Sequence, residues 1–195
     1  MYYKIISILF MALIFNACSI KEVPAMKVYT LSVPAVKASL NGRYRQKIIK
    51  ISYPTALNEK LSNKINYSYS LLDRGEYLHS VWSNNLSKLL QGSIVQILMD
   101  SKLFSVVVSS KSNIKDDYRL ESSIFDFSHH VRGGKSYAIM SIHCILINVD
   151  SGKFEKEKRF SYIVDTKTTD ARGYVEATNV IMSKFAKDLV KWLEK

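Results

Sequence analysis

The residues with the chemistry for catalysis or metal binding are scattered along this chain of 195 residues. Metal binding needs three or four ligands that converge on one point. His129 and His130 are adjacent in a segment with strand composition, so we expect their side chains on opposite faces of the strand. The best candidate ligands are two cysteines, Cys18 and Cys144, and four histidines, His79, His129, His130 and His143.

The predicted hairpin that follows these histidines keeps the candidate ligands apart. Gly133-Gly134 supplies the backbone freedom that a tight turn needs. Pairing across that turn places His143 opposite Ile124, well away from His129. We therefore predict neither a metal site nor a bound cofactor.

Catalytic signatures are also missing from the sequence. No serine lies in a Gly-x-Ser-x-Gly elbow, and Gly133-Gly134-Lys135 lacks the spacing of a phosphate-binding loop. The acidic pairs Asp116-Asp117 and Glu155-x-Glu157 are interpreted as solvated turns. Trp82 and Trp192 fall on predicted core stripes. This pattern favours a binding or scaffolding protein and predicts that the chain is not an enzyme.

Cys18 is the residue whose surroundings indicate a specific modification. Residues 1–4 carry one positive charge, and residues 5–15 form an apolar run broken by Ser7 alone. A membrane-spanning helix needs about 20 apolar residues, whereas the core of a signal peptide needs about 7–15. The run therefore predicts a signal peptide, and the small residue Ala17 stands directly before Cys18.

This arrangement resembles the lipobox of bacterial lipoproteins. The resemblance implies a lipoprotein signal peptide over residues 1–17, cleavage before Cys18, and acyl chains such as palmitate attached at Cys18. Phe15 and Asn16 depart from the usual leucine and small residue of that motif. The alternative is an ordinary signal or an uncleaved anchor with an incidental Cys18. Ser19, where aspartate would favour retention in the inner membrane, favours the outer membrane.

Export changes which partners the positive charge of the chain favours. The chain has 28 Lys+Arg against 17 Asp+Glu, a formal net charge of +11. In the cytoplasm this charge would favour nucleic acid, but outside it the expected anions are phospholipid headgroups or an acidic partner protein. We therefore expect no nucleic-acid partner. Lipidation of Cys18 would leave Cys144 as the remaining thiol, in an apolar run that predicts a buried structural role.

Apolar periodicity predicts two long helices. Residues 79–100 carry apolar side chains, Trp82 among them, at spacings of three and four, and residues 171–194 do the same after an Asp170 N-cap. The lysines near the end of the second helix are interpreted as a solvated face, with a patch that contacts membrane lipid as the alternative: Lys184, Lys187, Lys191 and Lys195.

Alternating and β-branched segments predict the strands. They cover residues 28–33, 47–52, 66–69, 103–108, 117–131, 136–149 and 155–165, with a turn at residues 73–75. A slip of apolar parity within residues 117–131 predicts a bulge, and apolar residues on both faces of 136–149 predict a central strand. We expect a two-layer α+β fold, with an antiparallel or mixed sheet and two long helices packed on one face. A lipidated tether over 18–27 would precede one domain over 28–195.

Taken in order, these segments resemble the ABC-type transport auxiliary lipoprotein family. Tyr77–Leu90 resembles the family's tryptophan-bearing helix start, with Trp82 at the tryptophan position, although Ser83-Asn84-Asn85 replaces the acidic and proline residues that usually follow it. The other matching segments are Val28-Tyr29-Thr30-Leu31, residues 48–57, Asp117-Tyr118-Arg119-Leu120, Ile124-Phe125-Asp126, a central strand ending in Asp150, and the long C-terminal helix.

The resemblance implies a non-catalytic accessory subunit of an ABC transporter system that moves lipids across the envelope. The implied partners are a mammalian-cell-entry (MCE) domain protein and the permease and ATPase of the transporter, with self-association into a homo-oligomer as a further expectation. The implied location is the periplasmic face of the envelope, at the outer rather than the inner membrane. Three alternatives stay open: an assembly lipoprotein such as a pilotin, a periplasmic enzyme with a dispersed Ser/His/Asp set, and a direct lipid carrier.

Overall fold

The computed structural model describes residues 24–39, 42–56, 62–70 and 72–195. The predicted signal peptide, Cys18 and most of the predicted tether lie outside these residues. The described elements, in chain order, are β1 (Lys27–Tyr29), β2 (Ile48–Ile51), β3 (Lys64–Ser68), β4 (Arg74–Trp82), α2 (Leu86–Ser101), β5 (Val106–Ser109), β6 (Tyr118–Arg132), β7 (Lys135–Asn148), β8 (Lys153–Asp165) and α3 (Ala171–Glu194).

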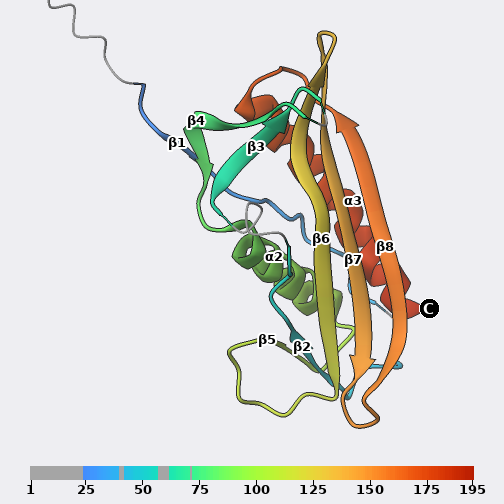
Figure 1. Cartoon of the computed structure of the whole chain (residues 1–195). Helices are drawn as coiled ribbons and strands as arrows, with labels where there is room; N and C mark the ends of the chain where they lie inside the picture. Colours follow the sequence, from blue (N-terminus) through green and yellow to red (C-terminus); the bar gives the residue numbers. More distant parts are fainter. Residues whose placement is uncertain (1–23, 40–41, 57–61, 71) are drawn as a thin grey trace, which may run out of the picture.

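β6 is the strand around which the sheet is organised (Figure 1). One edge of β6 pairs antiparallel with β7, which pairs antiparallel with β8. The other edge pairs in parallel with β2 near the start of β6 and with β3 near its end. β5 extends the sheet beyond β2, while β4 and then β1 extend it beyond β3. The sheet is mixed, and β7 is internal, as its two apolar faces predict.

The predicted bulge lies in the middle of β6. The β6–β7 register shifts between Ile124 and Asp126, which leaves Phe125 as the inserted residue. Between this shift and the hairpin turn the register is as expected, with Arg132 paired to Lys135. On the other side of the shift, toward the start of β6, His143 pairs with Ser123, so the prediction that His143 faces Ile124 is wrong by one residue. The inserted residue accounts for both the parity slip and this error.

The two helices and the sheet enclose one core. Figure 1 shows α3 behind β6, β7 and β8. Buried side chains of both helices pack in a single cluster with alternate residues of β7, among them Ala138, Met140, Ile142, Cys144 and Leu146. This arrangement confirms the α+β fold class. Cys144 is fully buried, as predicted, and burial raises the pKa of its thiol to about 12.

The predicted helix over residues 79–100 is wrong at its start. β4 continues to Trp82, whose backbone pairs with Tyr29, and α2 begins at Leu86. The side chain of Asn85 accepts a hydrogen bond from the backbone N–H of Lys88 and caps the helix. The four-residue spacing between Trp82 and Leu86 matches a helix by coincidence, because both side chains enter the same core from different elements.

Two further boundaries differ from prediction near the N-terminal half of the sheet. The first strand ends at Tyr29, and the chain then crosses α3, where the Ser32 N–H donates to the side-chain oxygen of Asn179. The predicted turn at residues 73–75 is wrong, because Arg74 and Gly75 pair with Ser68 and Tyr67 as the first residues of β4. Gly75 is needed here: a Cβ would lie 2.5 Å from the Tyr67 hydroxyl.

Candidate functional site

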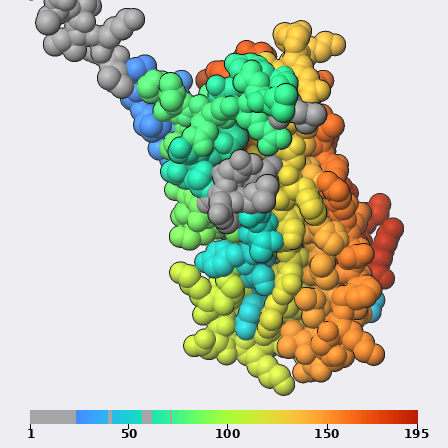
Figure 2. Space-filling model, viewed as in Figure 1, coloured from blue at the N-terminus to red at the C-terminus, as the bar shows by residue number. Residues whose placement is uncertain are grey.

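A groove of about 680 Å³ lies between β3, β4 and β6. Figure 2 shows these strands, teal to green for β3 and β4 and yellow for β6, on the face turned toward the viewer. The bulge at Phe125 lies in the β6 wall, and β3 pairs with β6 over two residues, at Tyr67–His129 and Ser68–His130. The wall residues combine charged and apolar side chains: Asn66, Tyr67, Ser68, Arg74, Gly75, Glu76, Leu78, Phe125, Asp126, Phe127, Ser128 and His130.

Three polar residues form a hydrogen-bonded row on the β6 wall of this groove. They alternate along the strand and therefore share one face. The Ser128 hydroxyl donates to Oδ1 of Asp126 at 2.5 Å and lies 3.0 Å from Nε2 of His130. The same Nε2 lies 3.5 Å from Oδ2 of Asp126. Burial lowers the pKa of His130, against the opposing effect of the Asp126 carboxylate.

The hydrogen bonds of this row differ from those of a catalytic triad. In a triad the histidine bridges serine and carboxylate through two different nitrogens and takes the serine proton. Here one nitrogen, Nε2 of His130, faces both partners, and Ser128 gives its proton to Asp126. The serine is therefore not activated as a nucleophile. The row is suited to hydrogen-bonding a polar group that enters the groove.

The histidines considered in the sequence do not converge. His79 is exposed on β4, and Nε2 of His143 lies 3.3 Å from the Glu157 carboxylate. His129 and His130 point to opposite faces of β6, as predicted, since His129 is fully buried and His130 lines the groove. Over the part of the chain that the structure describes, no group of three or more His, Cys, Asp or Glu side chains could hold a metal ion.

His129 occupies the core behind the groove. Its Nδ1 lies 2.6 Å from the hydroxyl of Tyr77, and its ring stacks on those of Tyr77 and Tyr174. Its other nitrogen, Nε2, is buried without a hydrogen-bond partner. Burial, with a contribution from neighbouring His130, lowers the pKa of His129 to about 4. His129 is therefore a neutral core residue that joins β6, β4 and α3.

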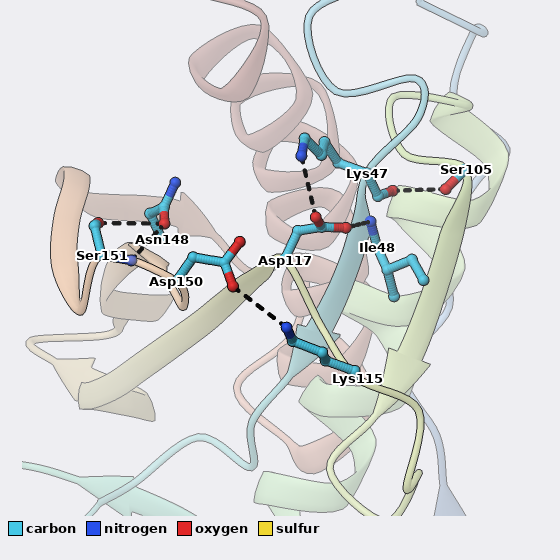
Figure 3. Close-up of polar contacts among 8 residues, drawn as sticks. All are labelled: Lys47, Ile48, Ser105, Lys115, Asp117, Asn148, Asp150 and Ser151. Carbon is cyan, nitrogen blue, oxygen red and sulfur yellow. Dashed lines mark hydrogen bonds and ion pairs between the residues drawn. The ribbon is translucent and has the colours of Figure 1, made fainter.

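The family-like residues Asp117 and Asp150 lie at the opposite end of the sheet (Figure 3). The Asp117 carboxylate accepts hydrogen bonds from the Ile48 N–H at 2.8 Å and from Nζ of Lys47 at 3.1 Å. The bond from the Ile48 N–H is the main reason that the pKa of Asp117 is lowered. Asp150 pairs at 3.6 Å with Lys115, in an exposed position. Asp117 thus fastens the start of β2 to the start of β6.

The interpretation of Asp116-Asp117 as a solvated turn is wrong. Asp116 is buried, with Lys50 Nζ at 2.9 Å and the Arg119 guanidinium at 3.2 Å. Burial alone would raise the pKa of Asp116, but the hydrogen bond from Lys50 and the charge of Arg119 lower it overall. The chain brings these three charges together by pairing β2 with β6, which no local pattern in the sequence indicates.

The remaining residues singled out in the sequence are Cys18 and four lysines. Cys18 is outside the described residues. The four lysines near the end of α3 are exposed, as a solvated face requires: Lys184, Lys187, Lys191 and Lys195. In the described residues, no helix has the length and apolar character needed to cross a membrane. The groove itself was missed by sequence reasoning, although the alternation Asp126-x-Ser128-x-His130 beside the parity slip was a usable signal.

Solved structures with the same fold are known. Protein XCC0632 from Xanthomonas campestris superimposes with a TM-score of 0.77 at 17% identity, covering 86% of this chain and 94% of that one. Hypothetical protein CT253 from Chlamydia trachomatis gives a TM-score of 0.50 at 10% identity, covering 76% of this chain and 96% of that one. At such identities the likeness shows the fold alone. No curated protein matches the chain significantly.

Family membership is given by the sequence model of the ABC-type transport auxiliary lipoprotein component, which matches residues 29–190. The matched stretch runs from β1 to the last turns of α3 and includes the groove, the buried His129 and the Asp116–Asp117 pair. The other matching strands and the long C-terminal helix follow one another in the structure as the resemblance implies, but Trp82 ends β4 and does not lie at a helix start. The chain therefore belongs to the family of ABC-type transport auxiliary lipoprotein components.

Proposed function

We propose that this protein is a lipid-anchored, non-catalytic accessory subunit of an ABC transporter system that moves lipids across the cell envelope, and that it works with an MCE-domain protein. The observation that carries the proposal is the family match over residues 29–190. The sequence has no phosphate-binding loop, so ATP hydrolysis would belong to another subunit.

The packing of the domain supports an accessory role over direct lipid carriage. A carrier needs an enclosed, largely apolar cavity of about 300–1,000 Å³. The space between sheet and helices is instead filled by side chains, with Leu90, Ile97, Met140 and Phe185 fully buried. The groove has a suitable volume, but its wall includes Glu76, Asp126 and His130 among the apolar residues. That chemistry suits a polar or mixed surface of a partner better than an acyl chain.

The anchor is the second part of the proposal. Acylation of Cys18 would hold the domain at the periplasmic face of the envelope, at the outer membrane if Ser19 acts as in other lipoproteins. Several acyl chains on one residue exceed what stable membrane attachment requires. Cleavage before Cys18 would remove Lys4 and leave a net charge of +10, which would favour anionic headgroups or an acidic partner surface at that location.

Affinity purification from the native host tests the proposal. The chain, tagged after Lys195, is extracted in mild detergent, and its partners are identified by mass spectrometry. We expect an MCE-domain protein with a permease and an ATPase. A Cys18→Ser variant is the matched control, because it removes the acylation site and should remain as an uncleaved or unanchored form. Recovery of a secretin or an outer-membrane barrel in place of the transporter would contradict the proposed function.

A further inference from the structure

Large apolar side chains are exposed at the end of the domain where the described chain begins. Leu72 is 99% exposed, Leu78 82%, Val28 63% and Met26 54%. Lys27 pairs with Ser80 in the parallel β1–β4 ladder, so Leu78 lies two residues, or about 7 Å, along β4 from β1. Figure 1 shows β1, β4 and the loop between β3 and β4 at the same end of the molecule. We call Met26, Val28, Leu72 and Leu78 the apolar end.

Cations lie beside the apolar end. Arg132 and Lys135 are paired residues at the tip of the β6–β7 hairpin, and both are exposed. Figure 1 shows this hairpin tip above the β3–β4 loop. Exposed apolar side chains next to Lys and Arg are the composition of a surface that lies in a membrane interface and attracts anionic lipids.

The length of the tether restricts where the membrane can be. Met26 is eight positions after Cys18, a stretch that spans at most about 30 Å even when fully extended. β6 has 15 residues and is about 45 Å long, and it runs from the starts of β2 and β5 toward the β3–β4 loop. A bilayer that holds Cys18 is therefore within reach of the apolar end.

We propose that the apolar end is seated in the interface of the bilayer that carries the Cys18 anchor, so that the opposite end of the sheet projects away from the membrane. This inference rests on the acylation of Cys18 in the proposed function. Moving an apolar side chain out of water is favourable in proportion to the apolar area that it buries. Because the anchor already confines the domain near the lipid, contact is an intramolecular step, and partial burial of Leu72 and Leu78 is enough to favour it.

Site-specific labelling of the full-length lipoprotein tests the seating. Leu72→Cys and Leu78→Cys are each labelled with an environment-sensitive fluorophore, and Phe154→Cys is the matched control, an exposed apolar position at the far end of β8. The buried Cys144 has a raised pKa and should stay unlabelled. The proteins are reconstituted into phosphatidylethanolamine–phosphatidylglycerol vesicles, with and without spin-labelled lipid.

We expect emission from positions 72 and 78 to shift to shorter wavelength on reconstitution and to be quenched by the spin-labelled lipid, with no change at position 154. Equal behaviour at all three positions would overturn the seating. So would a shift at 72 and 78 that occurs in detergent without lipid and grows with protein concentration, because it would indicate contact with a second copy. Labelling of the parent protein at Cys18 would refute acylation, and thus the anchor in the proposed function, separately from the seating.

Discussion

The two ends of the sheet are built with opposite chemistry. At the distal end, where β2, β5 and β6 begin, acidic side chains pair with cations and with backbone N–H groups, as in the Lys50–Asp116–Arg119 and Lys47–Asp117 contacts. At the anchor-side end, which carries β1 and the proposed membrane contact, Leu72 and Leu78 are exposed, while His129 is fully buried and lies within hydrogen-bond distance of the partly buried Tyr77. The distal end uses its charges to hold strands together, although Phe154 is exposed there too, and the anchor-side end carries the most exposed leucines of the described residues, Leu72 and Leu78.

The largest effect is expected from removing the buried charge at the distal end. In Asp116→Ala, Lys50 would lose its partner in a site where its side chain is mostly buried, and Arg119 would lose its acceptor. Removing one member of a buried ion pair costs about 3–5 kcal/mol, so we expect the free energy of unfolding to fall by about 3 kcal/mol or more. Urea unfolding followed by circular dichroism measures this change.

The matched control is Asp150→Ala at the same end. Its ion pair with Lys115 is exposed on both sides, and exposed pairs contribute about 0–1 kcal/mol. A similar loss of stability for Asp116→Ala and Asp150→Ala would show that burial does not distinguish the two pairs. The claim that buried ion pairs stabilise the distal end would then be wrong.

As the pH falls, the protein should lose the stability that depends on His129 before the stability that depends on the distal carboxylates. The pKa of His129 is lowered from 6.5 to about 4 in the folded protein, chiefly by burial, so between these values the unfolded chain binds a proton that the folded protein does not. Stability is complete above about pH 6.5 and falls as the pH drops toward 4, by up to about 3 kcal/mol. Urea unfolding at pH 7.5, 5.5 and 4.5 measures the loss.

The distal carboxylates also lose their contribution as the pH falls, but in a lower pH range. The pKa values of Asp116 and Asp117 are lowered from 3.8, so their contribution is present above pH 3.8 and is lost below it. His129→Phe should remove most of the stability change between pH 6.5 and 4 and leave the part that comes from His130, whose pKa is also lowered by burial, whereas His79→Gln, at an exposed position, should leave the change in place. An unchanged pH dependence in His129→Phe would mean that another group controls the acid response.

A moderate effect is expected at the first turn of α3, on the anchor-side end. The Asp170 carboxylate accepts hydrogen bonds from the Thr168 hydroxyl at 2.6 Å and from the Gly173 N–H at 2.9 Å. Loss of an N-cap costs about 1 kcal/mol, so Asp170→Ala should lower Tm by about 2–4 °C in calorimetry. Asp170→Ser keeps a capping oxygen and should recover most of the loss. An equal loss in both variants would place the effect outside the cap.

Local signals in the sequence predicted the parts of the fold that depend on neighbours along the chain. The N-cap at Asp170 and the apolar stripe that follows it predicted α3, and the slip of apolar parity predicted the bulge found at Phe125. The buried role of Cys144 followed from its apolar run. The parallel pairings of β6 with β2 and β3 join residues about 60 to 70 positions apart, and no periodicity encodes them.

The features that depend on those distant pairings were the ones that sequence reasoning missed. The groove exists because β3 and β6 separate beside the bulge, and Asp116 is buried because Lys50 of β2 lies over it. The start of α2 was misplaced for a different reason. Trp82 and Leu86 are four residues apart, which fits one helical face but also fits two elements that pack in the same core. The N-cap at Asn85 shows that the helix begins at Leu86 and does not include Trp82.

The smallest stability effect is expected at the apolar end, and it sharpens the comparison most. Leu72 and Leu78 are almost fully exposed, so replacing each by serine removes few contacts within the domain. Exposed substitutions usually change stability by less than about 0.5 kcal/mol, whereas Leu98→Ala, in the core, should cost about 2–5 kcal/mol. Urea unfolding in lipid-free detergent measures all three variants. A loss above about 1 kcal/mol in Leu72→Ser or Leu78→Ser would mean that these side chains support the fold itself. A near-zero change in the free energy of unfolding would mean that the fold does not need these leucines. If the same variants also reduce the lipid quenching of a neighbouring label, the leucines serve the membrane contact.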